Sequence, residues 1–185
     1  MGSFSYSSKY PSAIKYNNTA VNYLKYNGNM VWIRPSLNLV NMTSSANLTY
    51  SVPISATYRI VLVGGGGKQN GTNGGGGSGG YCYFDKYLTK GTSINFHCGG
   101  AGDKSYATVS GATHYAYAGG DGYGYWGGYM NRTWIHGGGA GGTHTDNGSN
   151  GNAGTSSGGN GASVYGGYGA GGGGTGLCRM WIVGG

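Results

Sequence analysis

The first sixty residues alternate between apolar and polar types, which predicts short β-strands. Residues 13–33 (AIKYNNTAVNYLKYNGNMVWI) follow this alternation and are rich in β-branched and aromatic residues. Asn27-Gly28 lies between two such runs, and a tight hairpin turn needs a positive φ angle at both central residues, which Asn and Gly accept. Asn17-Asn18 offers a first, looser turn. We therefore expect a meander of about three strands that ends at Pro35.

A second pair of strands is predicted after this meander. Residues 37–43 (LNLVNMT) and 46–52 (ANLTYSV) alternate in the same way on either side of Ser44-Ser45. Alternation of this kind is typical of a half-buried sheet, so we expect the two segments to pair with each other.

Further strands bracket a glycine-rich zone. Each is a short apolar or alternating run bounded by glycine, which is a strand signature. The turn Thr89-Lys90-Gly91 joins two of them. The predicted strands are residues 58–63, 81–88, 92–98, 106–109, 133–136 and 177–183.

Composition changes sharply near residue 60. Of the 45 glycines only Gly2 and Gly28 precede residue 61. Glycine costs about 1 kcal/mol per helical position relative to alanine, and the chain contains no glutamate, so a helical domain is not expected. Three prolines and the lack of a Gly-X-Y repeat exclude collagen. An aromatic content of 14% argues against a flexible glycine linker, which is the alternative reading of such a composition.

Glycine runs such as GGGG and GAGGGGTG can pack only through their backbones. A helix of the polyproline II type has no internal hydrogen bonds, so its N–H and C=O groups are free to bond laterally, and glycine lets such helices approach closely. We therefore expect an all-β protein: residues 1–53 form a small N-terminal β-meander module for attachment or assembly. Residues 54–185 form a glycine-rich β domain, with polyglycine II helices flanked by strands and the intervening sequence extruded as loops.

Residues 115–136 (YAYAGGDGYGYWGGYMNRTWIH) concentrate aromatic side chains among glycines. Tyr and Trp give a large, rigid contact area with a polar tip at little entropic cost, which suits a recognition surface, and their rings also stack on sugars. The alternative is that these rings fill the protein's own core. The predicted receptor-binding residues are Tyr115, Tyr117, Tyr123, Tyr125, Trp126, Tyr129 and Trp134.

Motifs that suggest catalysis lack the context they need. Residues 76–80 fit G-x-S-x-G and residues 136–139 fit HGGG, but a nucleophile elbow requires a following helix and the opposite order of motifs. The three cysteines (Cys82, Cys98 and Cys178) lack C-x-x-C spacing and are expected to be buried, reduced thiols. We therefore predict no enzyme activity, no cofactor and no metal site.

The formal net charge of +7 arises from scattered basic residues. No Lys/Arg cluster or RGG triplet is present, so direct nucleic-acid binding is not predicted. The N-terminal sequence MGSFSYSSKY has no apolar core of a secretory signal, and no run approaches about 18 apolar residues, so no membrane span is predicted.

The order of these segments resembles a viral family. The stretches YRIVLVGGGG (58–67), GGYCYFDKYLTKGTSINFHCGGAG (79–102) and GAGGGGTGLCRMWIVGG (169–185) resemble, in this order, the glycine-rich domain of bacteriophage tail-fibre and tail-tip proteins. The likeness covers residues 58–185. Residues 14–32 (IKYNNTAVNYLKYNGNMVW) look like short N-terminal modules of phage virion proteins.

This resemblance implies a virion structural or adhesin role. In adhesins of the T-even type, glycine-rich motifs form a polyglycine II sandwich whose distal loops bind the host receptor. It also implies that residues 1–53 contact other virion proteins, that subunits form a homo-oligomer, with a trimer as the habit of fibres, and that the protein reaches the virion surface after assembly in the host cytoplasm. Its aromatic loops would bind a host-surface glycan or protein. The alternative is a purely structural subunit of a fibre, capsid decoration or extracellular matrix that self-assembles without a receptor.

Overall fold

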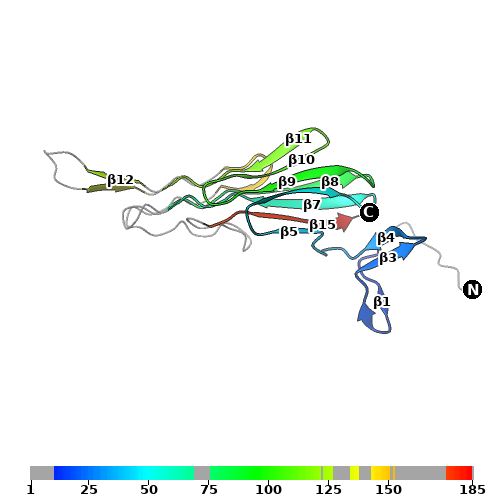
Figure 1. Ribbon diagram of the computed structural model, residues 1–185. Coiled ribbons are helices and arrows are strands. Elements are labelled where there is room, and N and C mark those ends of the chain that lie inside the picture. Colours follow the sequence, from blue (N-terminus) through cyan, green and yellow to red (C-terminus); the bar gives the residue numbers. More distant parts are fainter. Residues whose placement is uncertain are drawn as a thin grey trace, which may run out of the picture.

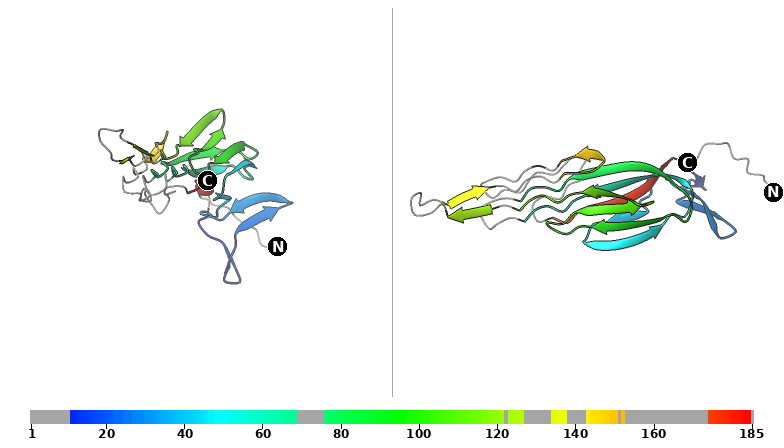
Figure 2. Two further views of the ribbon diagram at one scale, coloured as in Figure 1. Left: turned by 60° about the vertical axis from the view of Figure 1, so that its left-hand side comes forward. Right: turned by 90° about the horizontal axis from the view of Figure 1, so that it is seen from above.

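A computed structural model describes residues 11–68, 76–121, 123–126, 134–137, 143–150, 152 and 174–184. These residues form an all-β protein in several antiparallel sheets, with no helix among them. The molecule is elongated along its strands: two small hairpins lie at one end, a β-sandwich in the middle, and strand β12 at the other end (Figure 1). The view from above in Figure 2 shows the same long axis.

The sandwich consists of a five-stranded and a four-stranded sheet. The first has the order β14-β8-β7-β15-β5 and the second the order β11-β10-β9-β6. The strands of the first sheet are β14 (Asn147–Ser149), β8 (Tyr81–Leu88), β7 (Ala56–Val63), β15 (Leu177–Gly184) and β5 (Val40–Met42). Those of the second are β11 (Ala112–Ala116), β10 (Ser105–Val109), β9 (Ser93–Cys98) and β6 (Ala46–Ser51).

Alternate residues of the two sheets meet in one hydrophobic core. Ile60 and Leu62 of β7 and Met180 of β15 are fully buried, and Ile94 and Phe96 of β9 face them from the second sheet. The apolar runs predicted at 58–63, 81–88, 92–98, 106–109 and 177–183 all lie in these strands, so those predictions are confirmed. The three cysteines are free and buried in the core, as predicted.

The N-terminal hairpins depart from the predicted meander. Strands β1 (Lys15–Tyr16) and β2 (Thr19–Ala20) form one pair, and β3 (Tyr23–Tyr26) and β4 (Asn29–Ile33) form another. The prediction of an Asn27-Gly28 hairpin is confirmed, with φ angles of 47° and 76°. The prediction of one continuous meander is wrong, because the Val21 N–H bonds back to Ile14 while the Asn22 carbonyl accepts from Arg34. Each hairpin thus closes on itself.

The predicted pairing of residues 37–43 with 46–52 is also wrong. Strand β5 pairs with β15 and strand β6 pairs with β9, so the two segments enter different sheets. Val40 of β5 is buried in the core of the sandwich, where it lies because β5 joins the five-stranded sheet rather than pairing with residues 46–52. The predicted domain boundary between residues 53 and 54 stays a prediction. Both sheets of the sandwich contain strands from each side of this boundary.

Glycine segments continue from the sandwich toward β12 and bond to one another through their backbones. Four successive N–H groups of residues 64–67 donate to Gly80, Asp103, Gly174 and Gly77, at 2.8–3.0 Å. Carbonyls of the same segment accept from Gly102 and Gly119. A strand in a sheet has at most two neighbours, whereas this segment has four, so the hydrogen bonds run in several lateral directions.

Close contact between these backbones excludes side chains. A Cβ atom added at Gly65 would overlap the carbonyl group of Gly100, and one at Gly67 would overlap that of Gly120. The same holds at Gly79, where the obstacle is the carbonyl group of Gly64. Glycine is therefore required here by space rather than by the φ angle.

Candidate functional site

The predicted receptor-binding residues fall into two groups. The backbone places Tyr123, Tyr125 and Trp126 on β12 (Tyr123–Trp126) and Trp134 on β13 (Trp134–Gly137). These two strands form an antiparallel hairpin, with Trp126 opposite Trp134, at the end of the molecule away from the N-terminal hairpins (Figure 1). Tyr129 lies outside the described residues. The other two residues, Tyr115 and Tyr117, lie at the sandwich.

The chain leaves the sandwich toward β12 and returns from β13 as a paired stem. The Tyr117 N–H donates to the Thr143 carbonyl at 2.8 Å, and the Thr145 N–H donates to the Tyr115 carbonyl at 3.1 Å. Ala116 and His144 form an antiparallel bridge between these two bonds. The stem therefore holds residues 115–117 and 143–145 side by side where they meet the sandwich.

A row of aromatic side chains crosses the outer face of the four-stranded sheet beside this stem. His97 of β9 and Tyr115 of β11 both lie opposite Tyr106 of β10 in the strand register. The His97 and Tyr106 rings stack with centroids 4.9 Å apart, and Tyr106 and Tyr115 are 5.7 Å apart. Tyr117 continues the row by stacking on Tyr115 at 5.5 Å. Such cross-strand pairs stabilise a sheet, typically by up to about 1 kcal/mol each.

Polar and charged groups occupy the ends and sides of this aromatic row. The His97 ring nitrogens lie 2.7 Å from Asn47 Oδ1 and 2.8 Å from Asp103 Oδ2. The Lys104 ammonium lies 4.9 Å from the centre of the Tyr115 ring. Stacking in the His97–Tyr106 and Tyr115–Tyr117 pairs, together with Lys104, therefore covers part of the ring faces. Tyr117, at 38% exposure, is the most open member of the row.

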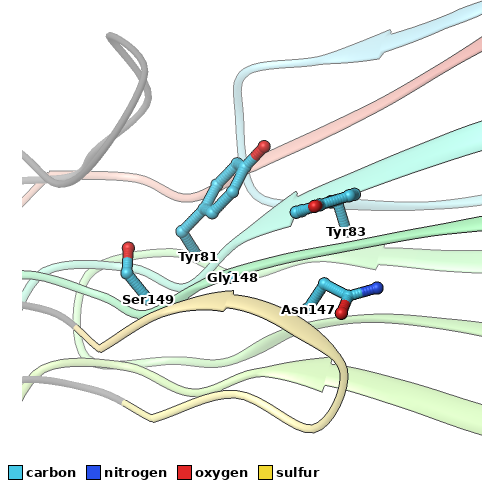
Figure 3. A pocket seen from close by; sticks show the side chains of 5 residues that line it. All are labelled: Tyr81, Tyr83, Asn147, Gly148 and Ser149. Carbon is cyan, nitrogen blue, oxygen red and sulfur yellow. The ribbon is translucent and has the colours of Figure 1, made fainter.

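The outer face of the five-stranded sheet carries a different arrangement of tyrosines. Tyr81 and Tyr83 of β8 lie with β14 residues Asn147, Gly148 and Ser149 around a hollow of about 400 Å³. Figure 3 shows the Tyr81 ring rising above the strand and the Tyr83 ring seen nearly edge-on beside Asn147. The two ring centroids are 5.8 Å apart and the rings are tilted by 39°, so they are not stacked on each other. This hollow therefore combines aromatic surface with an amide.

Two further features bear on the chemistry of this hollow. The Ser149 hydroxyl oxygen is buried and has no hydrogen-bond partner among the residues that the structure describes. The Arg59 guanidinium lies 5.3 Å from the centre of the Tyr83 ring, and it forms two hydrogen bonds of 2.7 Å with the Asp85 carboxylate. The Arg59 charge is thus balanced locally, and the hollow suits a neutral ligand better than an ion.

A partly buried polar cluster holds the returning segment to the sandwich. One carboxylate oxygen of Asp146 accepts hydrogen bonds from His114 and Thr145, both at 2.8 Å, and a weaker one from the Cys82 thiol. Burial alone would raise the pKa of Asp146, but these hydrogen bonds outweigh it and hold that pKa below its ordinary value. Burial raises the pKa of Cys82 to about 11, so this thiol is not poised as a nucleophile.

Other expectations about chemistry can be placed in the structure. Ser78 of the G-x-S-x-G sequence is fully buried, and its hydroxyl exchanges hydrogen bonds with the backbone of Asn152. Among the described residues, no group of three or more His, Cys, Asp or Glu side chains is arranged to hold a metal ion. The described part of the chain also contains no helix suited to spanning a lipid bilayer. The absence of enzyme activity stays a prediction.

Comparison with known proteins adds no relative. No protein family matches the chain, and no curated protein is similar enough to be identified as a homologue. The likeness to phage fibre proteins therefore stays an expectation from the quoted sequence stretches.

Sequence reasoning missed four aromatic residues at these surfaces: Tyr81, Tyr83, His97 and Tyr106. Alternation in the predicted strand 81–88 places Tyr81 and Tyr83 on one face, so that signal was present in the sequence. The position of Tyr106 between His97 and Tyr115 depends on the register of three strands, which the sequence alone does not give.

Proposed function

We propose that this chain is a non-enzymatic structural protein of a virus particle, of the fibre or adhesin type, that attaches to a host surface through aromatic residues. One observation carries the proposal: the aromatic β12–β13 hairpin lies at one end of an elongated molecule and the N-terminal hairpins at the other (Figure 1). Such a division suits a mounting end and a contact end. The proposed partners are other virion proteins at residues 1–53 and a host glycan or protein receptor at the far end.

We further propose that the glycine segments form a bundle of the polyglycine II type. Two features support this arrangement: the lateral hydrogen bonds of residues 64–67 to four neighbouring segments, and the overlap that any Cβ atom would cause at Gly65, Gly67 and Gly79. A bundle of this kind is rigid without a side-chain core. It would hold the aromatic hairpin away from the sandwich, and so away from the particle.

The hollow beside Tyr83 offers a second contact for the same receptor. Two tilted tyrosine rings and the Asn147 amide are groups with which proteins contact a neutral sugar ring. Many weak contacts of this sort become strong when identical subunits share one particle, either as homo-oligomers or as an array.

Binding of the fluorescently labelled, purified protein to a panel of candidate host cells tests the proposal. We expect strain-selective binding that is abolished by the triple substitution Tyr125→Ala, Trp126→Ala and Tyr129→Ala, with little change in thermal stability. Tyr83→Ala is expected to weaken binding. Tyr87→Ala is its matched control, because Tyr87 lies on the same face of the same strand, outside the hollow, and is 60% exposed.

A purely structural subunit is the second candidate. It is favoured by the exposure of Tyr16 and Tyr26 on the N-terminal hairpins, at 73% and 71%, because such surface suits assembly. Failure to bind any cell, together with regular assemblies in electron micrographs of the purified protein, would replace the adhesin proposal with this one. A large loss of stability in the triple variant would place those rings in a core rather than in a receptor contact.

A further inference from the structure

The two N-terminal hairpins enclose an apolar groove of about 690 Å³. Ile14 and Val21 line it from the first hairpin and its connection, and Leu24 and Val31 line it from the second. Lys15 and Lys25 also line the groove, so its rim is basic. None of these residues belongs to the sandwich core.

The frame of this groove is anchored to the sandwich. Trp32 and Ile33, at the end of β4, are buried, and the Trp32 indole N–H donates to the Pro11 carbonyl at 2.9 Å. The Lys90 ammonium donates to the Asn29 side chain at 2.8 Å, which ties the hairpin turn to the sandwich. The wall of the groove that β4 forms is therefore held in place.

The groove walls themselves lack cover within the described residues. Val31 is 47% exposed and Leu24 is 36% exposed, which is unusual for aliphatic side chains gathered in one place. Each hairpin has only two strands, and an isolated two-stranded sheet is marginally stable in water. Both edges of each hairpin are also without a partner strand in the described part of the chain. A bound segment would supply both the missing apolar contacts and the missing backbone hydrogen bonds.

The charge of the groove indicates which kind of segment could bind in it, a second copy of this chain or a different protein. The first 84 residues contain no Asp or Glu, so nothing on this part of the chain neutralises Lys15 and Lys25. A second copy of the chain does not offer carboxylates either, because all four are already engaged. Asp85 pairs with Arg59, Asp103 with His97, Asp146 with His114, and Asp121 accepts from the Lys68 N–H.

We propose that the groove binds an extended segment of a different protein, in which apolar side chains alternate with Asp or Glu. Such a segment adds as a strand to a hairpin edge, places its apolar side chains against Leu24 and Val31, and pairs its carboxylates with Lys15 and Lys25. This inference rests on the proposed function in one respect, since it assigns the N-terminal end to attachment on a partner protein.

Two fluorescent nine-residue peptides test the proposal on the full-length protein: one alternates Leu with Glu and the other alternates Leu with Lys. Fluorescence polarisation is expected to show the Leu-Glu peptide binding about tenfold more tightly than the Leu-Lys peptide. The double variant Lys15→Glu and Lys25→Glu should reverse this order. Val31→Glu should weaken binding of the Leu-Glu peptide, whereas Leu48→Glu should not, because Leu48 is similarly exposed but lies on β6, outside the groove.

Each contrary result overturns the proposal in a recognisable way. Equal binding of both peptides, or an order that the lysine variants do not change, would remove the role of charge. Dimerisation of the wild-type protein that Val31→Glu abolishes would make a second copy the occupant. Peptide binding that appears only in the variant Phe4→Ser, Tyr6→Ser and Tyr10→Ser would make the chain's own N-terminal segment the occupant. Cell binding by the Val31→Glu variant is measured separately, so failure of the groove proposal is distinguishable from failure of the adhesin proposal.

Discussion

Replacement of Gly65 by alanine tests whether the glycine segments are packed backbone against backbone. The added Cβ atom would overlap the carbonyl group of Gly100, which is main chain and has no rotamer through which to move away. Relief requires the two segments to separate, which strains the two hydrogen bonds between them, from the Gly65 N–H to the Asp103 carbonyl at 2.8 Å and from the Gly102 N–H to the Gly66 carbonyl at 2.9 Å.

The expected loss follows from these two effects. Overpacking of a filled interior costs about 1–3 kcal/mol, and each weakened buried hydrogen bond costs about 1 kcal/mol. The free energy of unfolding should therefore fall by about 3–5 kcal/mol in Gly65→Ala. For a chain of this size about 2–4 °C are lost per kcal/mol, so the melting temperature should fall by about 6–20 °C.

Gly100→Ala is the matched control, because it lies in the same zone but has room for a side chain. Its added Cβ atom would lie 3.4 Å from Ser45 Cβ and 3.5 Å from Ser45 Oγ, which is an ordinary contact distance. Its stability should change by no more than about 0.5 kcal/mol. Thermal unfolding followed by circular dichroism or calorimetry measures both variants. Equal melting temperatures would refute the close backbone packing and, with it, the proposed polyglycine II bundle.

Three further predictions concern the sandwich. Tyr58→Phe should lower the free energy of unfolding by about 1 kcal/mol in chemical denaturation, because the buried Tyr58 hydroxyl donates to the Ile54 carbonyl at 2.7 Å; no loss would mean that this bond has no net value. A thiol reagent such as Ellman's reagent should label none of the three buried cysteines in the native protein and all three after unfolding; rapid native labelling would contradict their burial. The pKa of Asp146 is held below its ordinary value of 3.8, so the stability that this carboxylate contributes is present above pH 3.8 and is lost as the pH falls through the lower pKa of the folded state. The substitution Asp146→Asn should remove this part of the acid dependence of unfolding. An unchanged acid dependence in the variant would contradict the prediction.

Local patterns in the sequence were sufficient to predict where the individual strands lie. The apolar run at 58–63 and the alternating run at 81–88 became β7 and β8, because burial of one or both faces of a strand leaves a periodic trace in the sequence. The Asn27-Gly28 turn was predictable for a local reason too, since few other residue pairs accept two positive φ angles.

Pairing between distant strands was not predictable in the same way. Residues 37–43 and 46–52 are adjacent and both alternate, but β5 joins β15 and β6 joins β9. Alternation predicts that a strand has one buried face, but it does not predict which sheet covers that face. The turn Thr89-Lys90-Gly91 shows the same limit, because it connects the two sheets rather than two paired strands.

Composition and periodicity alone predict an all-β protein in which glycine disfavours helix and the glycine runs pack through backbone contacts. Which backbones meet is visible only in the folded chain, because a segment such as 64–67 carries no side chains that encode its four neighbours. The tertiary structure also separated the aromatic segment into two parts, with Tyr115 and Tyr117 beside the sandwich and Tyr125 and Trp126 at the far end. The physical reason is common to both cases: composition and periodicity act over a few residues, whereas register and lateral packing depend on groups far apart in the chain.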